Sequence, residues 1–219
     1  MKKLQKLSKD KEEEVIVPEE DATSFFNMVK EPELRITGVY GDINEEKSSE
    51  VVYGLMTLHF SGQQACEAGS SDDPDSKDAI TFEPIDFYVS TYGGSATEMF
   101  AIYDAMRSIR DLTPVRTHGL GKVMSAGVLL LAAGTKGTRR IGRYCRVMIH
   151  GVVAGTQGFI ADVENEFAET KNTQKMYIKA LSEETNMEEK YIKKLMSKKK
   201  NVYLNADEAV NLGIADIIV

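Results

Sequence analysis

A serine, a histidine and a pair of glycines are the residues whose types and positions could do chemistry together. Ser125 is followed by the small residues Ala126 and Gly127 at the start of a strongly apolar segment, and His150 ends the apolar run RVMIH. A helix N-terminus presents free N–H groups that stabilise an oxyanion forming beside it. Gly93 and Gly94 follow another apolar run, where a glycine turn can direct an amide into a crevice. Each feature alone has an ordinary explanation as a cap, a packed histidine or a turn. Together they indicate a nucleophile, a base and an oxyanion donor, the groups that acyl transfer needs.

Other catalytic and ligand-binding motifs do not fit the sequence. Gly121 and Lys122 resemble the end of a phosphate-binding loop, but Val123 stands where that loop needs Ser or Thr. Val123 also occupies the first glycine position of a G-x-S-x-G elbow around Ser125. The three histidines lie far apart and form no H-E-x-x-H metal helix. The aspartates of residues 70–78 lack the glycine and final glutamate of a calcium loop, so we expect a solvated acidic loop there.

Composition narrows the class of protein. The chain has 219 residues, of which 42% are hydrophobic and 28% charged, as in a globular α/β domain. A formal net charge of −7 argues against a general nucleic-acid surface. Cys66 and Cys145 form no C-x-x-C pair, which argues against a disulfide scaffold or structural zinc site. The longest apolar stretch, residues 126–133, is too short to span a bilayer, and the lysine-rich beginning lacks the apolar core of a signal peptide. We therefore expect a cytoplasmic protein.

The segments that must position these residues alternate between strands and helices. The expected strands are residues 35–41, 85–91, 114–119 and 146–150, and the expected helices are residues 48–60, 96–109 and 121–134. This order predicts βαβ crossovers and a largely parallel sheet. Open sheets of this kind bind ligands at the carboxyl ends of their strands, which is where Gly93 and His150 fall.

The two ends of the chain differ in pattern. Residues 1–30 are charge-dense and predicted as a flexible arm, and residues 31–219 as one domain. An extended glycine-containing segment, residues 151–158, precedes a long helix at 160–181. One stripe of that helix is apolar and contains Ile160, Val163, Phe167, Tyr177, Ile178 and Leu181. A further helix is expected at 187–196, capped by Thr185 or Asn186. Asn205 and Glu208 predict a capping box for a last helix that stops at Gly213, before a final strand.

From residue 85 onward the chain resembles the family of ClpP, the proteolytic subunit of the Clp protease. The matching blocks are YGGS, AIYDAM, GKVMSAGVLLLAAGTKG, RVMIH, GTQG and YLNADEAVNLGIADII, in the family's order. The resemblance implies a ClpP/crotonase-type α/β spiral of βαβ units. It also implies that a strand and helix at residues 151–181 protrude as a handle, and that residues 70–78 are an insertion.

The resemblance further implies a serine endopeptidase that cleaves unfolded proteins through an acyl-enzyme and needs no metal or organic cofactor. Ser125 would be the nucleophile, His150 the general base, and the N–H groups of Gly94 and Ala126 the oxyanion hole. The residues expected to pair with an extended substrate are Gly151, Val152 and Val153. The family forms stacked heptameric rings fed by an ATP-driven AAA+ unfoldase. We therefore expect self-association, an unfoldase or other ClpP subunits as partners, and neither nucleic acid nor membrane.

Departures from the family pattern leave a second function open. Asn201 stands where the family has the third triad aspartate, and an asparagine orients an imidazole without stabilising the imidazolium by charge. Asp162 or Glu164 could supply the missing carboxylate. Asp86 stands at a position where the family has an aromatic docking residue. The alternative is a catalytically weak or inactive ring subunit that assembles with active subunits and regulates them. A crotonase-type hydratase does not account for the serine and histidine.

Overall fold

The computed structural model describes residues 34–65, 80–197 and 201–219. The predicted arm at residues 1–30 and the acidic loop at 70–78 lie outside the described residues. Arg35–Val219 forms one compact unit, to which all of the following refers.

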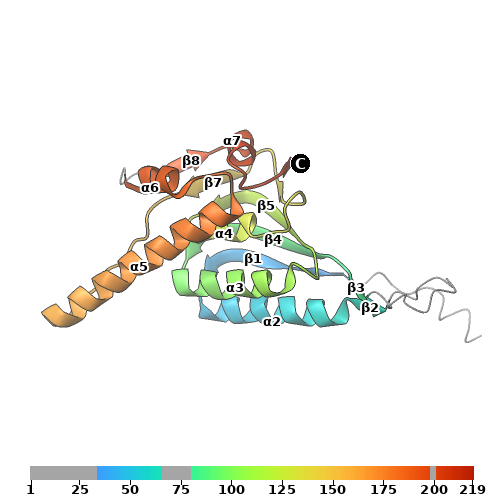
Figure 1. The fold of residues 1–219 in the computed structure, drawn as a ribbon, viewed down its shortest axis with the longest axis horizontal. Helices are drawn as coiled ribbons and strands as arrows, with labels where there is room; N and C mark the ends of the chain where they lie inside the picture. The colour runs from blue at the N-terminus through green and yellow to red at the C-terminus, as the bar shows by residue number, and fades with distance from the viewer. Residues whose placement is uncertain (1–33, 66–79, 198–200) are drawn as a thin grey trace, which may run out of the picture. The chain divides into compact units, whose positions relative to one another are not determined.

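The fold is built on a mostly parallel β-sheet (Figure 1). Its main path consists of parallel neighbours in the order β1 (Ile36–Ile43), β4 (Ile85–Gly94), β5 (Val115–Met124), β6 (Arg140–Ile141) and β9 (Ile217–Ile218). The end of β5 also pairs in parallel with β7 (Arg146–Ile149), and β8 (Val202–Leu204) pairs antiparallel with β7. A separate short hairpin joins β2 (Gln63–Ala65) and β3 (Ile80–Phe82). The predicted α/β fold with a parallel sheet is confirmed.

Helices pack against this sheet and against one another. Their bounds are α2 (Glu45–Ser61), α3 (Ala96–Ile109), α4 (Ala126–Ala132), α5 (Ile160–Glu184), α6 (Glu189–Ser197) and α7 (Ala206–Asn211). α4 contacts β4 and β5 on one side and α3 and α5 on the other, and every one of its residues is buried. α3 has the predicted bounds, and the predicted capping box of Asn205 and Glu208 opens α7. No helix among the described residues is long and apolar enough to cross a membrane.

Two predictions near the candidate catalytic residues were wrong. The helix expected from Gly121 begins only at Ala126, because Lys122, Val123 and Met124 continue β5 and pair with β7. The tight turn expected at Gly93 and Gly94 is instead the end of β4, paired with the end of β1. In both cases a neighbouring strand supplies backbone partners that extend the sheet past the local turn signal.

The start of α6 also differs from the prediction. The helix begins at Glu189 rather than Met187. Thr185 and Asn186, the two alternatives expected as its cap, both lie at least three residues before that start. The Thr185 hydroxyl donates to the carbonyl of Leu181 at 2.6 Å and so closes the end of α5.

A buried polar cluster fixes the C-terminal end of α5. The Glu184 carboxylate accepts hydrogen bonds from Tyr103 Oη at 2.9 Å, Arg107 Nη1 at 2.9 Å and Arg110 Nη1 at 2.8 Å. Burial alone would raise the pKa of Glu184, but these bonds, led by Arg110, hold it below its usual value. Arg139 donates to the carbonyl of Glu184 and also pairs with Asp216. The cluster thereby ties α5 to α3 and to the C-terminal segment.

The N-terminal half of α5 projects from the rest of this unit (Figure 1). Ile160 is 79% exposed and Phe167 is 57% exposed, whereas Tyr177, Ile178 and Leu181 are buried. The predicted apolar stripe is therefore divided between a half that packs on the body and a half that is open to solvent in the single chain.

Candidate active site

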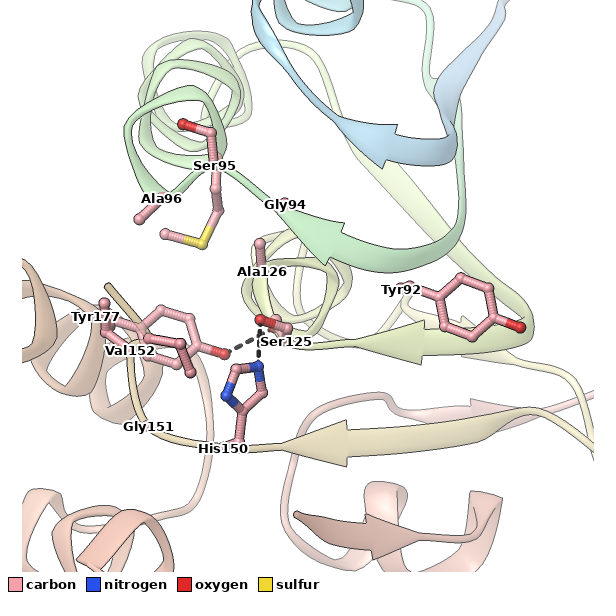
Figure 2. Close-up of a pocket in the computed structure, with 12 residues that line it drawn as sticks. Tyr92, Gly94, Ser95, Ala96, Ser125, Ala126, His150, Gly151, Val152 and Tyr177 are labelled. Atoms are coloured by element: carbon pink, nitrogen blue, oxygen red, sulfur yellow. Dashed lines mark hydrogen bonds between the residues drawn. The ribbon is translucent and has the colours of Figure 1, made fainter. Parts of the chain in front are cut away.

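Ser125 and His150 lie in direct contact. His150 Nε2 is 2.8 Å from Ser125 Oγ (Figure 2). The contact follows from the sheet, because the residues after the parallel neighbours β5 and β7 meet at the same edge. The Ser125 N–H donates to the carbonyl of Met148 at 2.8 Å and holds the serine against the strand that precedes His150. A hydroxyl within hydrogen-bond reach of an imidazole nitrogen is the arrangement that activates a serine nucleophile.

The backbone of Ser125 is strained. Its φ of 54° and ψ of −121° make it the one non-glycine residue with positive φ among the described residues. Such a conformation costs about 1–3 kcal/mol and is typical of functional sites. A serine at a strained strand-to-helix junction matches a nucleophile elbow in shape, although the sequence around it lacks the first glycine of that motif.

Glycines from two places make room for this turn. A Cβ on Gly127 would lie 2.4 Å from Cγ2 of Thr91, and a Cβ on Gly93 would lie 2.6 Å from Cβ of Ser125. Gly93 comes from β4, so it supplies the space that an elbow motif obtains from its own first glycine. No local sequence pattern around Ser125 could have shown that Gly93, from another strand, takes the place of the motif's first glycine.

Both predicted oxyanion donors lie beside Ser125. Ala126 opens α4, and the first N–H groups of a helix have no intrahelical acceptor. Gly94 ends β4, and a Cβ there would lie 2.2 Å from the carbonyl oxygen of Ile43. Both residues line a cavity of about 350 Å³ together with Ser125 and His150. The wall of the cavity is largely apolar and includes Met99, Val152, Val153 and Tyr177.

The sequence model of the family described as Clp protease matches residues 76–219. This stretch covers β3 to β9 and α3 to α7, and so contains the Ser125–His150 contact and its cavity. The chain belongs to the Clp protease family. The resemblance found from the sequence blocks is confirmed, and the chain is a ClpP-like peptidase by family.

Asn201, the predicted third member of the triad, lies near His150 in this Clp protease chain but does not bond to it. The two residues line a second cavity of about 370 Å³ together with Gln174 and Met196. Within the described residues, no hydrogen bond joins Asn201 to His150. Asp162 and Glu164, the carboxylates considered as substitutes, are exposed in the first turns of the projecting α5 and line neither cavity. In the single chain they do not reach the imidazole.

The predicted substrate-pairing residues border the same site. Gly151, Val152 and Val153 follow His150 and line both cavities. Residues 151–158 belong to no strand in the described single chain, so the expected handle strand lacks a partner there. The Val152 N–H donates to Gln174 Oε1 at 3.1 Å, which fastens this segment to α5.

Two further groups bear on the chemistry of this Clp family member. Cys145 is buried, and burial raises the pKa of its thiol to about 11, so it is not a second nucleophile at neutral pH. Tyr177, expected only as part of an apolar stripe, donates its hydroxyl to the carbonyl oxygen of Ser125 at 2.9 Å (Figure 2). The alternation of apolar residues along α5 gave no sign of this bond, because it joins residues 52 positions apart.

Proposed function

We propose that the chain is a serine endopeptidase subunit of a Clp-type compartmentalised protease that hydrolyses peptide bonds of unfolded proteins. The observation that carries the proposal is the 2.8 Å contact between His150 Nε2 and Ser125 Oγ at the edge of a cavity in a Clp family chain. The strained backbone of Ser125 supports it, because such strain persists where function requires it.

The proposed reaction is acyl transfer in two steps. Ser125 Oγ attacks the carbonyl carbon of the peptide bond while His150 Nε2 takes the hydroxyl proton. The electron pair of the C=O bond moves to the oxygen, which accepts hydrogen bonds from the N–H groups of Gly94 and Ala126. The intermediate then expels the amine, which takes the proton from His150, and leaves an ester on Ser125. Water attacks this ester with His150 as base, releasing the acid and restoring the hydroxyl. Apart from the substrate and water, every group used belongs to the chain, so the proposal includes no cofactor.

The surroundings of the site support an extended polypeptide as the substrate. Residues 151–158 pair with no strand among the described residues, and Gly151, Val152 and Val153 line the cavity. A substrate strand can therefore pair with this segment through main-chain hydrogen bonds. Such pairing accepts many side-chain sequences. We further propose that the chain assembles into rings. The exposed side chains of Ile160 and Phe167 on α5 support this assembly, because other subunits could bury them. A cytoplasmic location and delivery of substrates by an unfoldase complete the proposal.

A second function is favoured by the surroundings of His150 and by Asp86. Among the described residues that line the two cavities, none has a carboxylate that could stabilise a histidinium. Asp86 forms an ion pair with Arg116 and a hydrogen bond with His118 Nε2, at 2.8 Å each, where the family has an aromatic docking side chain. The chain would then be a weak or inactive ring subunit that modulates active ones.

Labelling with a fluorophosphonate tests the proposal. We expect one adduct per chain by intact mass, none on Ser125→Ala, and much slower labelling of His150→Gln. Ser182→Ala is the matched control, because its hydroxyl donates within α5, to the carbonyl of Lys179. Equal labelling of Ser125→Ala and Ser182→Ala would remove Ser125 from the mechanism. Labelling without hydrolysis of an unfolded protein or a peptide would favour the regulatory subunit.

A further inference from the structure

Tyr177, which lines the same cavity, holds the backbone of the proposed nucleophile. Its hydroxyl donates to the carbonyl oxygen of Ser125 at 2.9 Å, and the N–H of Val128 donates to the same oxygen at 3.0 Å. Tyr177 is only 5% exposed, and burial raises the pKa of its phenol, so the hydroxyl keeps its proton at any working pH. The carbonyl of Ser125 is therefore held by two donors.

This carbonyl belongs to the same rigid unit as a proposed oxyanion donor. The peptide bond is planar, so the C=O of Ser125 and the N–H of Ala126 turn together and point in opposite directions. Holding the oxygen on Tyr177 consequently fixes the direction of the Ala126 N–H. Stabilisation of an oxyanion depends on donors that are oriented before the reaction begins.

The Ser125–Ala126 peptide needs such support because the backbone of Ser125 is strained. At φ 54° the backbone of Ser125 lies outside the regions that side chains ordinarily favour. Relaxing that strain would rotate the Ser125–Ala126 peptide and turn the N–H away. The N–H of Val128 belongs to the first turn of α4 and would move with the Ser125 carbonyl, so its bond does not prevent the rotation. Tyr177 belongs to α5, so its bond does oppose the rotation.

The helix that carries Tyr177 is itself firmly placed. Glu184, two turns further along α5, is fixed by the buried bonds from Tyr103, Arg107 and Arg110. One turn before Tyr177, Gln174 accepts the N–H of Val152. One face of α5 therefore contacts both the nucleophile's peptide and the segment that follows His150.

We propose that Tyr177 is a positioning residue that keeps the Ser125–Ala126 peptide oriented with its N–H toward the reacting oxygen. The role rests on the proposed peptidase function of this site. It is distinct from packing, because the aromatic ring of a phenylalanine would fill the same space without making the bond.

Tyr177→Phe, compared with Tyr103→Phe, tests this role. Both substitutions remove a buried phenol hydroxyl from a contact involving α5, but Tyr103 bonds to Glu184, not to the Ser125 peptide. Loss of a whole oxyanion donor lowers kcat about 10²–10³-fold, and a loosened donor still acts part of the time. We expect kcat for a peptide substrate to fall about 10-fold in Tyr177→Phe with KM nearly unchanged. It should stay near wild type in Tyr103→Phe, because Arg107 and Arg110 still hold Glu184 and so keep α5 in place.

A pair of inhibitors separates positioning from general damage. A peptide aldehyde adds Ser125 Oγ to its carbonyl carbon and produces a hemiacetal oxygen that needs the oxyanion donors, whereas the matching peptide alcohol binds without reacting. Tyr177→Phe should weaken the aldehyde about 10-fold and leave the affinity for the alcohol unchanged. Equal weakening of both, or no effect on either, overturns the role of Tyr177. A wild-type chain that binds no aldehyde and hydrolyses nothing overturns the peptidase proposal itself, and the positioning role with it.

Discussion

Replacing Gly93 with alanine perturbs the packing around Ser125 in a way that the structure makes quantitative. A Cβ at Gly93 would lie 2.6 Å from Cβ of Ser125 and 3.0 Å from its Oγ. Ordinary contact begins at 3.4 Å, so the two Cβ atoms must move apart by about 0.8 Å. Gly93 is held in β4 by its pairing with Asp42 and by Thr91 Oγ1, which accepts its N–H at 2.9 Å. Much of the displacement therefore falls on Ser125.

A displacement of this size separates Ser125 Oγ from its working position. Misplacing a reacting group by about 1 Å can lower the rate about 10²-fold. We expect fluorophosphonate labelling and kcat/KM of Gly93→Ala to fall by about that factor. The variant should also lose about 1–2 kcal/mol of unfolding free energy, because φ at Gly93 is 111° and alanine disfavours positive φ.

Gly137→Ala is the matched control. Gly137 has φ 86° and a Cβ there would meet nothing within 4 Å, so the substitution carries a backbone cost without a contact. Urea unfolding should show Gly93→Ala destabilised at least as much as Gly137→Ala, because only Gly93→Ala adds a close contact to the backbone cost, and only Gly93→Ala should label slowly. If Gly93→Ala labels as fast as Gly137→Ala, the reasoning that close packing positions Ser125 is refuted.

Three other substitutions test separate parts of the structure. Asn201→Asp should raise kcat about 10- to 100-fold by stabilising the histidinium, and an unchanged kcat with assembly intact would show that position 201 does not limit turnover. Glu184→Gln should lower the unfolding free energy by about 3 kcal/mol at pH 7, because three donors lose a buried carboxylate. Since the folded-state pKa of Glu184 is lowered, its contribution is present above its unfolded pKa and lost as pH falls through the folded one. Urea titrations should therefore show the two proteins converging in acid, and a pH-independent difference would contradict this. Phe167→Glu, on the exposed half of α5, should shift sedimentation toward smaller species, and an unaltered profile would place the subunit contacts elsewhere.

The features predicted correctly from sequence depend on local signals. Asn205 and Glu208 specify the start of α7 by themselves, because a capping box forms between residues three apart. The helix that follows Ser95 has the predicted bounds because its cap and apolar spacing agree. Gly213, with φ 72°, ends α7 as its position indicated.

The features missed from sequence depend on residues far apart in the chain. The strand β5 extends to Met124 because β7 lies beside it, which the local glycine signal at Gly121 could not convey. The elbow at Ser125 uses space left by Gly93, on another strand. The contact between Ser125 and His150 was accessible to prediction because two strand ends of one parallel sheet meet at one edge. The bond from Tyr177 was not, because it requires the path of α5 across the body.

The projecting half of α5 has a consequence for how subunits would associate. In a lone chain its exposed turns gain little from tertiary contacts, and short helical segments in water are only marginally stable on their own. Fixing each backbone residue costs about 1–2 kcal/mol in conformational entropy, which a contacting surface must offset. Association of subunits and ordering of these turns are then thermodynamically linked. The amide hydrogens of these turns should therefore exchange more slowly as the protein concentration rises. Part of the energy of any subunit contact is consumed in this ordering, which favours an assembly that forms reversibly over one that is permanent.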